Sequence, residues 1–74
     1  MNATIRIGRR NTKRAHVIAE DKTDQQRIND LVCCFTGHEV SPMLTASGTL
    51  TIMAHAVHDV SAYLQAKNVG VSLG

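Results

Sequence analysis

The sequence predicts a small α+β domain with the element order ββαββα, in which two helices pack on one face of a four-stranded, mainly antiparallel sheet. Three observations predict it. Apolar and polar residues alternate in two runs that a polar loop separates, apolar residues then recur at helical spacing, and a second hairpin pattern is followed by a second set at helical spacing. At 74 residues the chain is expected to form one domain, residues 1–74.

The first hairpin is predicted by alternation near the start of the chain. Residues 3–8 place isoleucines on one side and threonine and arginine on the other, as in a strand with one buried face. Residues 9–13 are polar and include an asparagine, which is typical of a hairpin loop. Residues 14–20 resume the strand, and because Val17 and Ile18 point to opposite faces, we expect partial cover on both sides.

The clearest helix is predicted over residues 24–36. Thr23 suits the N-cap, and Gln26 three residues later completes a capping box. Gly37 stands where a glycine commonly ends a helix. The helix is expected to bury one apolar stripe, formed by Ile28, Leu31, Val32 and Phe35.

The second half predicts another hairpin and helix. Strands at about 42–46 and 49–55 are expected to meet at a two-residue turn, 47–48. The last helix is predicted to end at Gly70, while its start stays open because residues 55–57 would equally prolong the strand. Its expected stripe is Val57, Val60 and Leu64.

The sheet face without helices would stay in water or pair with another subunit. We expect it to present small, weakly polar residues, a mix that suits a homodimer and equally an ordinary exposed face: Met43, Thr45, Thr49, Thr51 and Met53. A chain this short buries only about 60% of its unfolded surface, so a dimer would help it to fold. A homodimer is therefore predicted.

Composition narrows the setting. Residues 40–58 are uncharged, but serine, threonine, glycine and proline interrupt them, so a membrane span is rejected. The chain opens without an apolar signal segment. Adjacent Cys33 and Cys34 would close a strained disulfide ring, so reduced thiols and a cytoplasmic location are expected.

Metal and enzyme chemistry are weighed and not predicted. Cys34 with His38, and His55 with His58, have spacings that zinc accepts, but no signature joins the two pairs, so neither metal nor cofactor is expected. His58 beside Asp59 resembles a base and its orienting acid, but no nucleophile motif accompanies them. Both cysteines are interpreted as small helix residues, with a redox role for the first as an alternative.

The basic start of the chain is the most informative feature. Five of the eight lysines and arginines lie within its first 14 residues, and they are the predicted macromolecule-binding residues: Arg6, Arg9, Arg10, Lys13 and Arg14. No acid precedes Glu20, and four of the six acids fall between residues 20 and 30. We therefore expect a charge dipole, with a basic hairpin followed by an acidic helix start.

These charges predict a small non-enzymatic protein that binds an acidic protein surface. A stoichiometric regulator or inhibitor is expected because small chains without a catalytic motif often have that role, including those of phages and mobile elements. The first alternative is a nucleic-acid-binding domain whose basic hairpin contacts phosphates. A net charge of only +2 and a hairpin without aromatic residues count against it. The second alternative is a small nuclease that uses histidine and arginine. The basic residues would also suit a loop that is only solvated and binds no partner.

Overall fold

The computed structural model describes residues 1–35 and 39–74. Its elements follow in chain order: β1 (Asn2–Ile7), β2 (Arg14–Ala19), the 3₁₀ turn η1 (Lys22–Asp24), α1 (Gln25–Cys33), β3 (Met43–Leu44), β4 (Leu50–Met53), the 3₁₀ turn η2 (Ala54–Ala56), α2 (Val57–Ala66) and β5 (Gly70–Leu73). The first predicted hairpin is therefore confirmed to within about one residue at each strand end.

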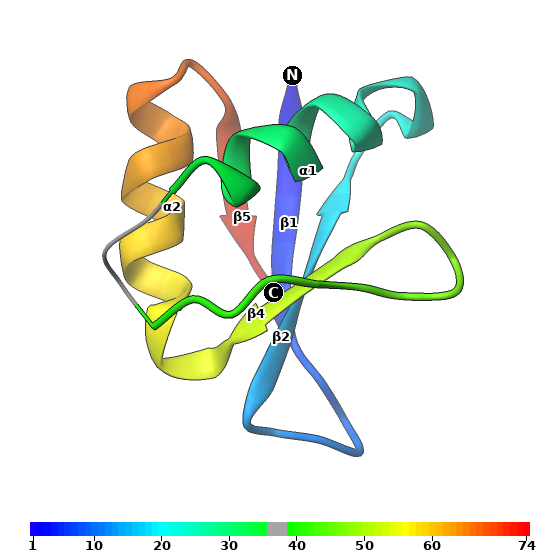
Figure 1. Ribbon diagram of the computed structural model, residues 1–74. Helices are drawn as coiled ribbons and strands as arrows, with labels where there is room; N and C mark the ends of the chain where they lie inside the picture. Colours follow the sequence, from blue (N-terminus) through cyan, green and yellow to red (C-terminus); the bar gives the residue numbers. More distant parts are fainter. Residues whose placement is uncertain (36–38) are drawn as a thin grey trace.

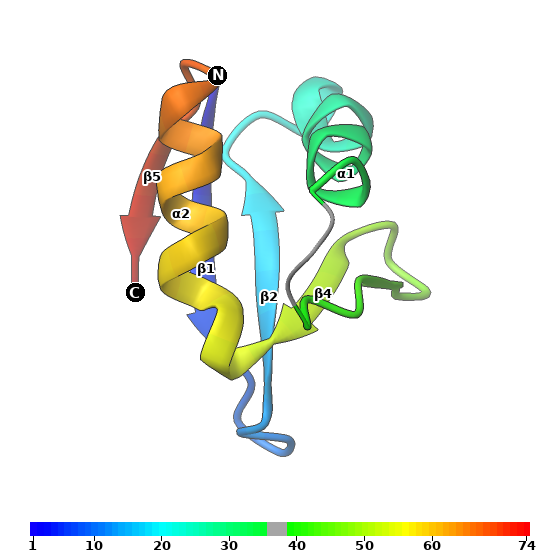
Figure 2. The same ribbon diagram turned by 60° about the vertical axis from the view of Figure 1, so that its left-hand side comes forward.

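The strands form one sheet in the order β3-β4-β2-β1-β5. The pairs β1–β2, β2–β4 and β3–β4 are antiparallel, whereas β1–β5 is parallel. Both helices cover the same face of this sheet (Figures 1 and 2). The α+β class and the four predicted strands are confirmed, but a fifth strand beside β1 makes the sheet mixed.

The fifth strand exists because α2 ends earlier than predicted. Asn68, with φ 66°, takes the left-handed position that follows the helix. The amide of Val69 donates to the carbonyl of Leu64 (2.9 Å), and the amide of Asn68 donates to that of Gln65 (3.0 Å), which is a Schellman motif. The chain turns back at Asn68, so Gly70 begins β5 instead of capping the helix.

The start of α1 also differs from its prediction. The side chain of Asp21 caps η1, because its Oδ1 accepts from the amide (3.0 Å) and the hydroxyl (2.9 Å) of Thr23. The predicted N-cap, Thr23, therefore lies inside this 3₁₀ turn. The helix ends at Cys33, short of the predicted residue 36, and the predicted terminating glycine, Gly37, lies outside the described residues.

The second hairpin has shorter strands and a longer turn than predicted. The amide of Thr45 donates to the carbonyl of Thr49 (2.8 Å), and that of Gly48 donates to Thr45 (3.0 Å). Gly48 has φ 87°, so the connection is a three-residue loop with a left-handed glycine. The open question at residues 55–57 is resolved by η2, which leads from β4 directly into α2.

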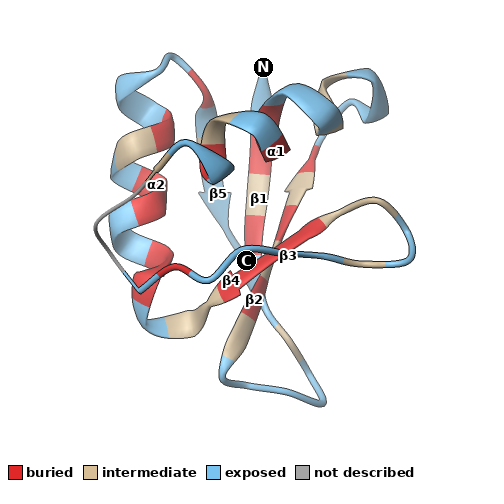
Figure 3. Cartoon of the chain, viewed as in Figure 1, coloured by how far each residue is buried: buried red, intermediate tan, exposed pale blue. Residues whose placement is uncertain are grey.

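The core lies between the sheet and the two helices (Figure 3). Alternate strand residues face it, among them Ala3, Ile5, Ala15, Val17, Leu50 and Ile52. The predicted helical stripes face the same core: Ile28, Val32, Val60 and Leu64 are fully buried. Phe35 stacks on Tyr63 with ring centroids 4.5 Å apart, so both aromatic residues of the chain serve the packing of the two helices.

Two side-chain amides continue the β2–β4 ladder beyond its last residue pair. The register pairs Val17 with Leu50, so its continuation would place Ala19 opposite Gly48. Instead, the amide of Ala19 donates to Oε1 of Gln25 (2.8 Å), and Nδ2 of Asn29 donates to the carbonyl of Gly48 (3.0 Å).

The two side chains are joined to each other. Nε2 of Gln25 donates to Oδ1 of Asn29 (2.9 Å) and to the carbonyl of Val17 (3.1 Å). We name the pair Gln25 and Asn29 the amide relay. It connects β2, α1 and the β3–β4 loop in one hydrogen-bond network.

Replacing Gln25 by alanine leaves the buried amide of Ala19 without its partner, so we expect Gln25→Ala to lower the free energy of unfolding by about 2 kcal/mol. The neighbouring Gln26 bonds only an exposed carboxylate, that of Asp30, and Gln26→Ala should change stability by less than about 0.5 kcal/mol. Urea unfolding measures both, and equal midpoints would contradict the relay.

Candidate functional site

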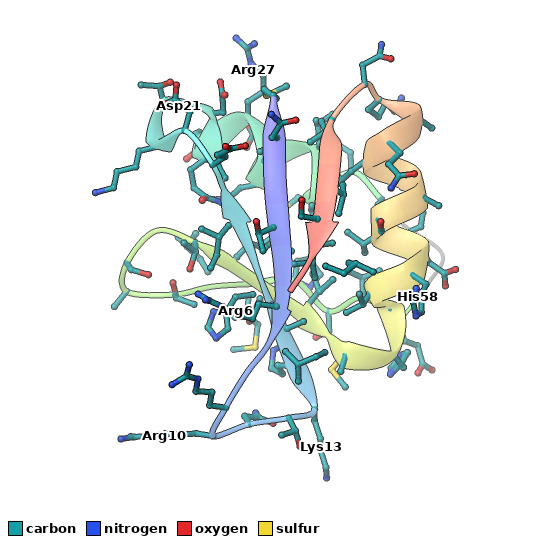
Figure 4. All side chains as sticks on the ribbon, turned by 180° about the vertical axis from the view of Figure 1, so that it is seen from behind. Arg6, Arg10, Lys13, Asp21, Arg27 and His58 are labelled. Atoms are coloured by element: carbon teal, nitrogen blue, oxygen red, sulfur yellow. The ribbon has the colours of Figure 1, made fainter. Side chains whose placement is uncertain are left out.

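The face of the sheet that the helices leave open carries the basic side chains. The register places Arg6 opposite His16 and His16 opposite Thr51, so these three residues form one row across β1, β2 and β4. Arg14 lies on the same face, two residues before His16 along β2. We call this side of the sheet the open face, and Figure 4 views the molecule from this side.

A concavity of about 610 Å³ lies at the end of this face, where the β1–β2 loop begins. Its lining includes four of the five predicted binding residues and comprises Arg6, Ile7, Gly8, Arg9, Arg10, Asn11, Arg14, His16 and Thr51. The fifth, Lys13, is exposed near the tip of the loop (Figure 4). We call Arg6, Arg9, Arg10, Lys13, Arg14 and His16 the basic end.

The loop that displays Arg9 and Arg10 is closed by backbone hydrogen bonds. The amide of Gly8 donates to the carbonyl of Arg14 (2.9 Å), and the amide of Arg14 donates to the carbonyl of Asn11 (3.2 Å). A Cβ on Gly8 would lie 2.7 Å from that Asn11 oxygen, so this close approach requires glycine. The two arginines therefore project from a defined turn.

Three of the four arginines that line the concavity have no partner within residues 1–35 and 39–74. The side chains of Arg6, Arg9 and Arg10 are exposed and make neither a hydrogen bond nor an ion pair with that part of the chain. No carboxylate of the described residues therefore pairs with these charges, and their N–H donors are free to bind solvent or a ligand.

Arg14 is placed differently from the other predicted binding residues. Its guanidinium donates from Nε to the hydroxyl of Thr51 (3.0 Å), from Nη2 to the carbonyls of Thr51 (3.0 Å) and Ser41, and from Nη1 to the sulfur of Met53 (3.3 Å). Four of its five donors are thus used within the chain. Arg14 adds charge to the concavity, while its donors attach β4 and the segment before β3 to β2.

The opposite end of the open face is acidic. A second concavity there is lined by Met1, Asn2, Glu20, Asp21, Lys22 and Asp24. Hydrogen bonds from the backbone amide and then from the hydroxyl of Thr23 hold the pKa of Asp21 below its usual range, so this carboxylate stays charged in mild acid. Figure 4 places Asp21 at the far end of the molecule from Arg10 and Lys13.

The residues weighed for metal or redox chemistry are dispersed. Cys33 and Cys34 are exposed free thiols, and the described ranges contain no group of three histidine, cysteine or acidic side chains placed to hold a metal ion. Nε2 of His55 lies 3.8 Å from a carboxylate oxygen of Glu39, and His38 lies outside the described residues. Within residues 1–35 and 39–74, each helix is too short or too polar to cross a bilayer.

Sequence reasoning missed His16 and the row that it completes. The alternation of β2 places residues 14 and 16 on one face, but only the hairpin register shows that Arg6 shares it. Of the five residues proposed for the homodimer face, Met43, Thr51 and Met53 belong to the open face by register, whereas Thr45 and Thr49 flank the three-residue β3–β4 loop.

Comparison with models of known protein families, with curated proteins and with solved structures gives no match for this chain. Its function is therefore inferred from the chemistry of the two ends of the open face.

Arg14 and Arg10 should respond differently to truncation. Arg14→Ala removes charged hydrogen bonds to the buried Thr51, the half-buried Met53 and the exposed Ser41, so we expect the free energy of unfolding to fall by about 2–3 kcal/mol. Arg10→Ala, at an exposed side chain without a partner in the described ranges, should change it by less than about 0.5 kcal/mol. Thermal and urea unfolding measure both, and an unaffected Arg14→Ala variant would contradict this assignment.

Proposed function

We propose that this protein is a small non-enzymatic binding protein that acts stoichiometrically on an acidic surface of another protein. The observation that carries the proposal is the group of three arginines, Arg6, Arg9 and Arg10, around one concavity and without partners in the described ranges. Lys13 adds a further positive charge near these arginines. The planar N–H groups of the arginines match the geometry of carboxylates. Occupying that surface would regulate or inhibit the partner.

The neighbourhood of the basic end supports a protein partner. Ile7 is 45% exposed at the rim of the concavity, and Met43, opposite Thr51 in the same row of the sheet, is 57% exposed. Arginine, methionine and other apolar side chains beside one another are typical of the centre of protein interfaces. Charge would accelerate the encounter, and the apolar residues would add contact area.

Two observations count against the nucleic-acid alternative. The only aromatic residues, Phe35 and Tyr63, stack on each other, so none remains on the basic end for base stacking. The carboxylates at the acidic end would repel a duplex that lay along the strands. The nuclease alternative is not proposed, because the described lining of the basic concavity contains one histidine and no carboxylate for acid–base chemistry.

Capture from a nuclease-treated lysate of the native host tests the proposal. Wild-type bait should retain a specific protein, and Arg9→Ala/Arg10→Ala should weaken its binding at least about tenfold, or about 1.4 kcal/mol. Arg27→Ala/Lys67→Ala is the matched control, since it removes the same charge from α1 and from the residue that follows α2, and it should bind like wild type.

The same variants distinguish the alternative. We expect no measurable binding of generic duplex DNA or RNA at low salt. Tight duplex binding that falls steeply with salt and is lost in Arg9→Ala/Arg10→Ala would replace the proposal with nucleic-acid binding. Equal protein capture by wild type and this double variant would also contradict it.

A further inference from the structure

The open face is complementary in charge to itself. Arg6 and His16 form a row near one end of β1 and β2, and Glu20 directly follows the other end of β2. Strand alternation places Glu20 on the same face as His16. The amide of Glu20 donates to the carbonyl of Asn2 (2.9 Å), so the hairpin pairing still holds there and Glu20 lies beside the start of β1.

A neutral row separates the two charged ends. The register pairs Thr4 with Ile18 on one side and with Ser72 on the other, so these three residues cross β2, β1 and β5 on the open face. None of them carries charge, and the half-buried Ile18 adds an apolar surface. Along the strands, the charge of the open face therefore changes from positive through neutral to negative.

We propose that two copies of this chain pack open face against open face, related by a two-fold axis that runs along the neutral row. This rotation reverses the strand direction of the second copy. It brings the basic end of each copy over the acidic end of the other, so Glu20 of one copy faces His16 and Arg6 of its partner. A symmetric dimer makes this contact twice.

The arrangement fits the dimensions of the molecule. Two sheets pack about 10 Å apart with their strands within about 30° of each other, and the neutral row supplies uncharged side chains at the centre of such a contact. The two longer extents of the whole molecule are 27 and 26 Å, and a rectangle of that size has an area of about 700 Å². A standard interface buries roughly 800 Å² on each partner, so a stable dimer of this kind needs contact over most of the face.

The dimer also has a regulatory consequence, which rests on the proposed function. The basic end would be covered by the acidic end of the second copy, so an acidic protein partner must displace that copy in order to bind. Free protein would then be stored as dimer and act as monomer. The dimer itself depends only on this chain and is tested without any partner.

Sedimentation velocity at low and high salt, over a wide concentration range, tests the charge contacts. Wild-type protein should form a dimer at low salt that weakens as salt rises. Arg9→Glu/Arg10→Glu and Glu20→Arg/Asp24→Arg should each weaken dimerisation at least about tenfold, and combining all four changes should restore it to within about threefold of wild type. Asp30→Arg/Glu39→Arg, at carboxylates that line neither concavity, is the control and should leave the dimer unchanged.

A cross-link tests the position of the axis independently of charge. In a Cys33→Ser/Cys34→Ser background, Thr4→Cys lies on the neutral row, so a short bismaleimide should join two copies efficiently. Ala62→Cys, on the exposed side of α2, should not cross-link. A wild-type monomer at every concentration in low salt, a combined variant no stronger than either reversal, or equal cross-linking at both positions would overturn the proposal.

Discussion

The amide relay is the constraint on which the rest of the structure depends. β2 is the central strand, and its partner β4 leaves it at Val17 because the β3–β4 hairpin turns away there. A buried strand end with an unpaired amide would be unfavourable. Gln25 and Asn29, in the first turns of α1, supply the missing hydrogen bonds. One network therefore bonds the end of β2, holds α1 against it and fixes the hairpin loop at Gly48.

The other end of β2 is held in the same way but with a charged group. Arg14 uses most of its donors on β4 and on the segment before β3, so its charge is fixed beneath the open face. Arg9 and Arg10 lie on a loop that backbone hydrogen bonds close, and Arg6 lies on β1, so the fold sets the backbone positions of all three. Since the acidic residues follow directly after the opposite end of β2, one strand both organises the sheet and separates the charges of the molecule.

Patterns within short stretches of sequence predicted the strands and helices that those stretches form. Alternation placed β1 and β2, and the apolar stripes identified the buried faces of both helices. The fifth strand was missed because Gly70 resembles a helix terminator, while Asn68, a less common choice, ends α2. The basic residues of the site were predicted from composition. Spacing alone did not predict that Arg14 is bonded within the chain while the other basic side chains are exposed, nor that His16 contributes to the site. Both depend on the register between strands.

The parallel pairing of β1 with β5 has a kinetic consequence. It joins residues 2–5 to residues 70–73, so the sheet is completed by the contact with the greatest separation in sequence. Contacts of this kind pay the loop-closure entropy late and slow folding relative to local hairpins. Until β5 docks, the edge of β1 is open and uncharged along most of its length, and this is the stage at which the folding chain is most exposed to pairing with another molecule.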